Sequence, residues 1–195
     1  MKNKTILISI IFSIIGAICC AVFIPLNCLG VVEAGVGEYL MFALYFVVVW
    51  LPPIVERLLH MEFYTLVDIF YQIFMVLAIL VGSVWRVYTL TEWYDKFVHV
   101  LFGALFGFMF YNFFSSVSKT KLSPLWLAIF SFCFAMMIGG MWEICEYTFD
   151  GVIAGQNTQR WEGLVGRDAL FDTMIDLVCD LAGSLISAVI VFFSE

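Results

Sequence analysis

The sequence predicts an all-α, polytopic membrane protein in which six transmembrane helices form a bundle. Hydrophobic residues make up 64% of the 195 residues and charged residues 13%, against about 45–50% and about 25% in soluble domains. A water-soluble chain of this size could not bury so much apolar surface. The net charge of −7 also argues against nucleic acid as a partner, because phosphate binding needs a basic surface.

Six apolar runs are long enough to cross the bilayer core, which takes roughly 20 helical residues. The first run follows Lys2 and Lys4 and lacks a small-residue cleavage site, so we expect a retained helix rather than a signal peptide. The second run contains Pro52 and Pro53, which should end or kink it. We expect one integral membrane domain over residues 1–195, with spans at 5–24, 38–55, 66–85, 95–114, 125–147 and 169–193.

The positive charges give a weak indication of orientation. Lys2 and Lys4 precede the first span, and positively charged segments tend to stay in the cytoplasm. The remaining Lys and Arg residues divide almost evenly between the two sides. We therefore predict that the N-terminus is cytoplasmic and, with six spans, that both termini are.

The ionisable residues inside the spans gather toward one side of the predicted bundle. They are spaced by three or four residues, which keeps side chains on one face of a helix. The fourth span begins, the fifth ends and the sixth begins on the same side, so these faces should meet. The residues are Asp95 and His99 on the fourth span, Glu143 and Glu146 on the fifth, and Asp172, Asp176 and Asp180 on the sixth.

Acidic groups that meet in this way need positive partners, because a carboxylate in hydrocarbon costs at least ~2.5–3.5 kcal/mol. One or two divalent cations would serve. Protein cations, namely Lys96, Arg160 and Arg167, are a second source, with some carboxylates protonated. Protons in a transport path are a third. Asp95 and Asp172 taken singly fit simple helix caps, but this does not explain the deeper acids.

We favour the divalent metal ion. The predicted ligands are Asp95, His99, Glu143, Glu146, Asp172 and Asp176, and we expect Asp180 to act behind the ligands or as a proton relay. An oxygen-rich set with one imidazole favours Mg, Mn or Fe over Zn. The sequence identifies no catalytic residue and no other cofactor.

Other charged and small residues have simpler interpretations. Asp68, early in the third span, is expected to pair with Arg57 or to face the membrane interface. The glycine pairs Gly103/Gly107 and Gly139/Gly140 should let the fourth and fifth spans pack closely. A loop opposite the acidic residues is interpreted as a solvated turn that carries Glu56, Arg57, His60 and Glu62.

Several short segments follow one another from about residue 50 to the C-terminus. They are Pro53-x-x-Glu56-Arg57, Tyr94 to His99, Gly140 to Glu146, Asp150, Gly155-Gln156-Asn157, and Asp172 to Leu177 with Asp180 and Gly183. In this order they resemble the YjdF-like family of bacterial inner-membrane proteins. The Asp95-Lys96-x-x-His99 element and the later aspartates are also similar, more distantly, to VanZ-type membrane proteins. The first resemblance implies an inner-membrane topology and no particular activity, and the second implies a role in the cell envelope.

These observations favour a metal-dependent membrane enzyme, a hydrolase or transferase, that acts on a lipid or lipid-linked envelope substrate. Membrane lipid is then the expected partner, and no protein partner is indicated. A proton or cation transporter that uses the same acids is the first alternative. The second is a non-catalytic envelope protein whose acids balance Arg160 and Arg167.

Overall fold

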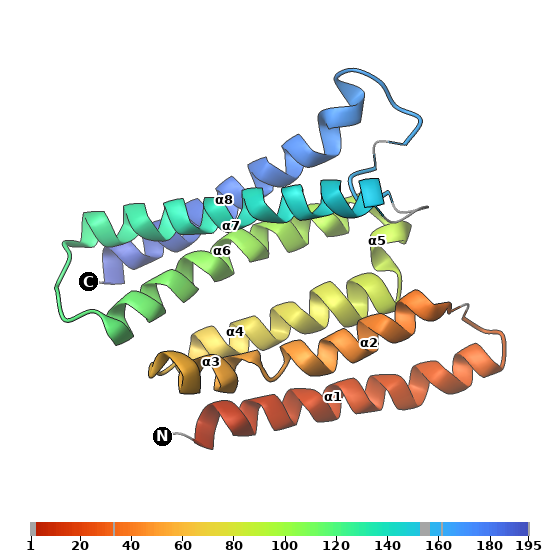
Figure 1. The fold of residues 1–195 in the computed structure, drawn as a ribbon, viewed down its shortest axis with the longest axis horizontal. Helices are drawn as coiled ribbons and strands as arrows, with labels where there is room; N and C mark the ends of the chain where they lie inside the picture. The colour runs from red at the N-terminus through yellow and green to blue at the C-terminus, as the bar shows by residue number, and fades with distance from the viewer. Residues whose placement is uncertain (1–2, 33, 153–156, 161, 195) are drawn as a thin grey trace. The chain divides into compact units, whose positions relative to one another are not determined.

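The computed structural model describes residues 3–32, 34–152, 157–160 and 162–194. All regular structure in these residues is helical, which confirms the predicted all-α fold (Figure 1). Lys2, used for the orientation, and Gly155 and Gln156 of the family resemblance lie outside the described residues. The helices are α1 (Asn3–Cys28), α2 (Val36–Val48), α3 (Leu51–Leu59), α4 (Thr65–Met75), the π-helix η1 (Val76–Val84), α5 (Val87–Leu90), α6 (Glu92–Val117), α7 (Pro124–Val152), the 3-10 helix η2 (Asp168–Leu170) and α8 (Phe171–Ser194).

Six helical stretches are long and apolar enough to cross a membrane, as the hydropathy predicts. Each predicted span lies within one of them or within a residue of its ends. The second stretch reaches Leu59 instead of residue 55. Pro52 and Pro53 break the helix as expected, but they fall in the first turn of α3, where proline is tolerated, so the helix resumes. The six stretches are Lys4–Cys28, Val36–Leu59, Thr65–Val84, Glu92–Val117, Pro124–Val152 and Asp168–Ser194.

The chain folds as two compact units, which are described separately below. Unit 1 comprises residues 1–94 and 112–118, and unit 2 comprises residues 95–111 and 119–195. Helix α6 supplies residues to both. The prediction of a single integral domain stays a prediction.

In unit 1, helices α1, α2 and η1 pack around an apolar core. Its largest buried members are aromatic: Phe23, Phe42 and Tyr45 pack with Val49 and the η1 residues Ile79, Leu80 and Val84. The ring of Phe23 meets those of Phe42 and Trp85 edge-on, with centroids 5.4 Å apart in both pairs. This core holds the broken second span against α1 and η1.

The charged segment from Glu56 to Glu62 is only partly the solvated turn that the sequence predicts. Arg57, His60 and Glu62 are exposed, but Glu56 is half-buried in α3, where its Oε1 accepts hydrogen bonds from Thr5 Oγ1 and Phe63 N. The predicted pairing of Asp68 with Arg57 is wrong. Asp68 is 1% exposed, and none of the ion pairs found among the described residues includes it. Asp68 turns into the protein because it lies on the buried face of α4.

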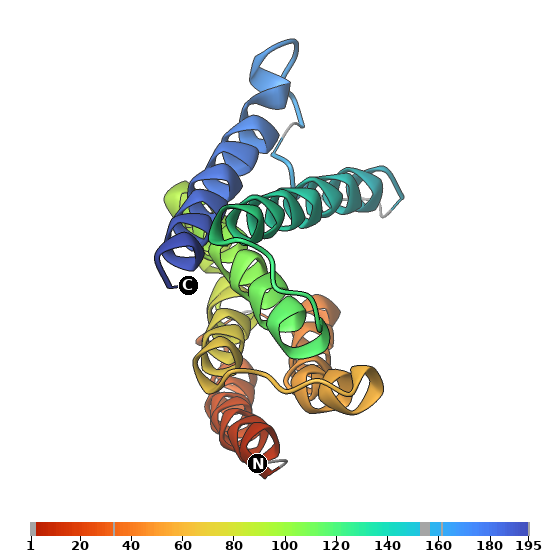
Figure 2. The ribbon, with the colours of Figure 1, turned by 90° about the vertical axis from the view of Figure 1, so that its left-hand side faces the viewer.

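In unit 2, α7 and α8 lie side by side and diverge toward the end of α7 and the start of α8 (Figure 2). Glycine sets the approach of α6 to α8. A Cβ on Gly183 would meet the backbone of Val100 and Ala104, and a Cβ on Gly103 would meet the backbone of Asp180 and Ser184. A Cβ on Gly107 would meet Ser187 of α8 and, at 3.7 Å, the backbone O of Ser131 of α7. The glycines of the fourth span therefore pack chiefly on the sixth span and, at Gly107, also approach the fifth.

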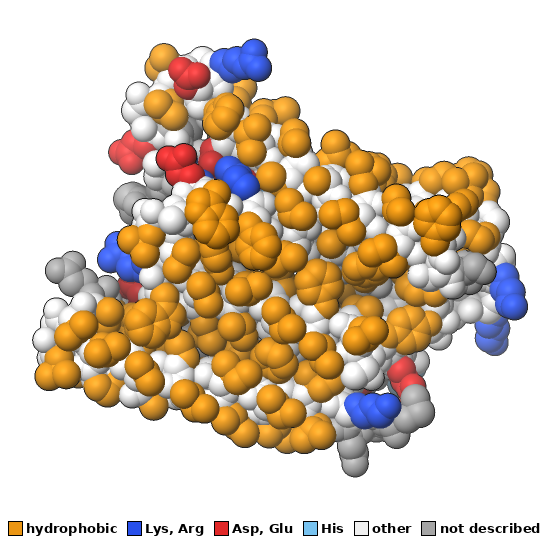
Figure 3. All heavy atoms as spheres, turned by 180° about the vertical axis from the view of Figure 1, so that it is seen from behind, with side chains coloured by type: hydrophobic (Ala, Val, Ile, Leu, Met, Phe, Trp, Pro, Cys, Tyr) orange, Lys and Arg blue, Asp and Glu red, His pale blue; other side chains and the backbone are white. Residues whose placement is uncertain are grey.

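The molecular surface suits a lipid environment. Apolar side chains cover most of the face seen in Figure 3, and the charged side chains gather toward the ends of the helices. Many large apolar residues of the spans are exposed, such as Ile14 on α1, Met141 on α7 and Val189 on α8. A surface of this kind is stable in hydrocarbon and unstable in water.

Candidate functional site

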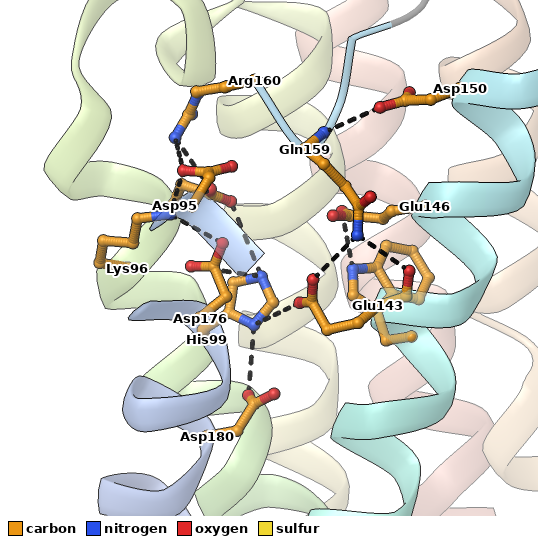
Figure 4. A network of polar contacts seen from close by, with 12 residues as sticks. Asp95, Lys96, His99, Glu143, Glu146, Asp150, Gln159, Arg160, Asp176 and Asp180 are labelled. Atoms are coloured by element: carbon orange, nitrogen blue, oxygen red, sulfur yellow. Dashed lines mark hydrogen bonds and ion pairs between the residues drawn. The ribbon is translucent and has the colours of Figure 1, made fainter. Parts of the chain in front are cut away.

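The functional side chains of unit 2 converge where α6 begins, α7 ends and α8 begins. Helix α8 turns one stripe inward, which starts with Asp172, Asp176 and Asp180 and continues with small residues such as Gly183 and Ser184. The eight residues from Asp172 to Asp180 rise about 12 Å along the helix. Across this depth, α6 and α7 place His99 and Glu143 against the stripe (Figure 4).

Two basic side chains lie among three carboxylates at the end of the site nearer the helix termini. Lys96 Nζ lies 2.5 Å from Asp172 Oδ1, 2.7 Å from Asp176 Oδ2 and 3.3 Å from Asp95 Oδ2. Arg160 Nη1 donates to Asp95 Oδ2 at 3.1 Å and to Asp172 Oδ1 at 3.0 Å. We call these five residues the outer group. Its three carboxylates each contact at least one basic side chain.

Asp150, at the end of α7, anchors the loop that carries Arg160. Its carboxylate accepts hydrogen bonds from the backbone N of Thr158 (2.8 Å) and of Gln159 (3.0 Å), and from Thr158 Oγ1 (2.6 Å). Arg160 itself adopts a left-handed backbone conformation with φ of 49°, which non-glycine residues use rarely. Burial lowers the pKa of its guanidinium, but the charges of Asp95 and Asp172 outweigh burial and raise this pKa above its ordinary value. The loop therefore delivers a permanent positive charge.

His99 lies between two pairs of carboxylates and is 4% exposed. Its Nε2 is 3.9 Å from Asp95 Oδ1 and 3.9 Å from Asp176 Oδ1. Its Nδ1 is 3.3 Å from Asp180 Oδ1 and 3.9 Å from Glu143 Oε1. One ring nitrogen thus faces acids that Lys96 and Arg160 also contact, and the other faces the deeper acids.

The deeper acids, Glu143 and Asp180, have little positive charge near them. We call His99, Glu143 and Asp180 the inner group. Among the described residues, His99 is the only basic side chain within ion-pair distance of Glu143 or Asp180. Gln159 Nε2 donates to the Glu143 backbone O at 3.1 Å and lies 3.4 Å from its Oε2. Glu143 Oε1 and Asp180 Oδ2 are buried without a hydrogen-bond partner.

The structure brings together some of the predicted ligands and leaves others apart. Two sets of three residues, each offering one ligand atom, have those atoms within 4.8 Å of one another: Asp95, His99 and Asp176, and the inner group. Asp180, predicted to act behind the ligands, is a member of the second set. Asp172 and Glu146 belong to neither: Asp172 pairs with Lys96 and Arg160, and Glu146 Oε1 accepts a hydrogen bond from Trp142 Nε1 at 2.9 Å.

The sequence did not predict the role of Gln159 at the site or the anchoring role of Asp150. Gln159 lies in a polar loop with no helical period, so its position in the sequence gave no indication that it contacts Glu143. Asp150 stood out only through the family resemblance. Arg160 joins the acids as one alternative predicted, whereas Arg167 is exposed and takes part in none of the ion pairs found among the described residues.

Comparison with known proteins identifies the family of the chain. An uncharacterised protein of Thermotoga maritima is 25% identical over 167 residues, which cover 83% of this chain and 80% of that protein. No solved structure matches the chain. The model of the predicted membrane protein family DUF2238 matches residues 11–195, nearly the whole chain. The protein therefore belongs to the DUF2238 family of predicted membrane proteins.

Proposed function

We propose that the inner group binds one divalent cation and that the protein is a metal-dependent membrane enzyme, a hydrolase or transferase for a lipid or lipid-linked substrate. The observation that carries this proposal is the pair of buried, unpartnered oxygens, Glu143 Oε1 and Asp180 Oδ2, beside a single imidazole. Two buried carboxylates against one histidine leave a negative charge that a cation would compensate.

The distances of the inner group suit such an ion. Metal–ligand bonds of about 2.0–2.6 Å place two ligand atoms of one ion about 3–4 Å apart. The spacings of 3.3 and 3.9 Å from His99 Nδ1 to Asp180 and Glu143 fall in this range. The oxygen-rich set favours Mg, Mn or Fe over Zn. A bound ion would polarise a phosphoryl or carbonyl oxygen, or lower the pKa of a bound water.

The outer group supports the inner group in this proposal. The carboxylates of Asp95 and Asp176 each lie 3.9 Å from His99 Nε2. With an ion held by Glu143 and Asp180, His99 would present the lone pair of Nδ1 to the ion and the hydrogen of Nε2 to these carboxylates, as in the carboxylate–histidine–metal arrangements of known sites. Lys96 contacts both Asp95 and Asp176, and Arg160 contacts Asp95. Of the six ligands predicted from the sequence, His99 and Glu143 thus keep that role, and Asp180 joins them.

The position of the site along its three spans supports the proposal that the substrate comes from the membrane. The outer group lies near the ends of spans whose surfaces carry exposed apolar residues such as Trp142 and Met174. A lipid headgroup would approach the inner group from this end, because headgroups lie at the boundary of the hydrocarbon core. We also propose two finer assignments. The resemblance suggests a YjdF-like protein of the bacterial inner membrane, with which the DUF2238 family is compatible. The N-terminal lysines and the six spans suggest that both termini are in the cytoplasm.

Metal binding is the first test. Protein purified without chelator and loaded with Mn²⁺ should hold about one ion per chain by elemental analysis and electron paramagnetic resonance. The variants Glu143→Gln and Asp180→Asn should lower the Mn²⁺ affinity at least tenfold. Glu146→Gln is the matched control, because Glu146 lies one turn from Glu143 but bonds to Trp142, and it should retain the ion. A wild-type protein without bound metal after supplementation would end this proposal.

Catalysis is the second test. Protein with Mn²⁺ is incubated with vesicles of bacterial total lipid, and the lipids are followed by untargeted mass spectrometry. A lipid that the wild type consumes and Glu143→Gln does not would identify the substrate. Proton or cation flux into liposomes that depends on Glu143, with no metal retained, would instead favour the transporter. This second candidate is supported by the order of Asp95, His99 and Asp180, which follow one another from the helix ends inward. Such a series could pass a proton from one residue to the next.

A further inference from the structure

Unit 1 contains a carboxyl group that its surroundings leave without a partner. Asp68 of α4 is 1% exposed, and neither of its side-chain oxygens has a hydrogen-bond partner. It lies in the third span, Thr65–Val84. An ionised carboxylate here has lost its water and gained neither a hydrogen bond nor a counter-charge, which makes the charged form unstable.

The break in the second span determines the orientation of the Gln72 side-chain amide. Pro52 and Pro53 have no N–H, so the carbonyl groups of Val48 and Val49 lack their helical donors. Side chains take over: Tyr71 Oη donates to Val48 O at 2.9 Å and Gln72 Nε2 donates to Val49 O at 2.9 Å. The Gln72 amide is thus held with its nitrogen toward α2, and its Oε1 is buried without a donor.

Two unsatisfied acceptors therefore share one face of α4. Asp68 and Gln72 are four residues apart, which brings side chains together on a helix, and both are buried on the same face of α4. A single hydrogen between them would satisfy both. A protonated carboxyl supplies it, because its O–H is a donor and Gln72 Oε1 is the acceptor that lacks one.

We propose that Asp68 is a proton-binding site inside the membrane, at which the carboxyl takes up a proton from water and donates it in a hydrogen bond to Gln72 Oε1. This site is separate from the one proposed in unit 2 and does not depend on it. The titratable groups whose charge reaches Asp68 among the described residues are Glu56 of α3 and Tyr71 of α4, and α1 contributes the neutral Ser9.

Infrared spectroscopy of the full chain tests this proposal. At neutral pH, the spectrum of wild type minus Asp68→Asn should contain the C=O band of a protonated carboxyl, which shifts when water is replaced by D₂O. Asp68→Asn should fold as well as the wild type, because its amide N–H can donate to Gln72 Oε1 in the same way. If the difference spectrum shows an ionised carboxylate instead, the proposal is wrong.

Further measurements distinguish a bound proton from a bound metal cation and test the acceptor. Adding NaCl at constant pH should leave the protonated band unchanged, and a band that disappears with sodium would make a metal cation the ligand instead. Glu56→Gln is the matched control, because it removes the neighbouring acid and should keep the band of Asp68. Gln72→Met removes the acceptor, so the band should move to the position of a carboxyl without a hydrogen bond. An unmoved band would contradict the assigned acceptor.

Discussion

At the scale of single residues, one glycine fixes the deepest acid of the candidate site. A Cβ on Gly139 would meet the Asp180 carboxylate, whereas a Cβ on the adjacent Gly140 would meet nothing. Asp180 is therefore seated directly against the backbone of α7. This contact holds its Oδ1 at 3.3 Å from His99 Nδ1.

The paired glycines give a sharp comparison. Gly139→Ala should displace the Asp180 side chain and destabilise the fold by about 1–3 kcal/mol, the usual effect of overpacking. Gly140→Ala should change stability by about 0.5–1 kcal/mol at most and in the stabilising direction, because Ala is the better helix former. Thermal unfolding in detergent and Mn²⁺ binding are the measurements. Equal behaviour of the two variants would show that Asp180 is not held in this way.

The residue scale also shows what the sequence could predict. Spacings of three and four placed Asp95, His99, Glu143, Asp176 and Asp180 on facing stripes, because the helical period alone decides which face a side chain occupies. The period does not decide which acid takes which partner. That choice depends on Lys96 reaching across from α6 to α8, a contact 76 and 80 residues apart in the chain, so the roles of Asp172 and Asp180 could not be told apart.

At the scale of elements, the loop between α7 and α8 depends on one carboxylate. Asp150 accepts three hydrogen bonds from Thr158 and Gln159, and the next residue is Arg160, whose guanidinium bridges Asp95 and Asp172. The helix end thus positions a basic group that the sequence places ten residues away. Loops without a helical period give no such signal in the sequence, which is why Gln159 went unpredicted.

Loss of this anchor should be visible by proteolysis. Asp150→Ala removes the acceptor for all three hydrogen bonds, so the loop should open more often and trypsin should cut after Arg160 severalfold faster. The rate is followed by mass spectrometry of the protein in detergent. Asp168→Ala removes an exposed acid at the start of η2 and serves as the control, with cleavage after Arg160 unchanged. A wild-type rate in Asp150→Ala would contradict the anchoring role.

At the scale of the whole molecule, composition and hydropathy sufficed for the fold class, because a bilayer requires long apolar helices and little else from the sequence. They also located all six stretches. What they could not supply is the grouping of residues 1–94 with 112–118 and of 95–111 with 119–195. That grouping depends on close helix contacts such as Gly183 on Val100, which only three-dimensional packing reveals.

The six-span topology makes a direct prediction about sidedness. In a background without native cysteines, Lys121→Cys, between α6 and α7, and Glu162→Cys, between α7 and α8, should react with a membrane-impermeant thiol reagent from opposite sides of the membrane. Both positions are exposed, and one span, Pro124–Val152, separates them. Labelling of both positions from the same side would show that this helix does not cross.

The contact between α6 and α8 limits the passage of ions and water through unit 2. Past Asp180, the inward stripe of α8 has no further charge, and its small residues press on the backbone and small residues of α6: Gly183 on Val100 and Ala104, and Ser187 on Gly107. The backbones of α6 and α8 approach too closely here for a chain of water molecules to lie between them. Ions and water would therefore not pass between α6 and α8 beyond Asp180.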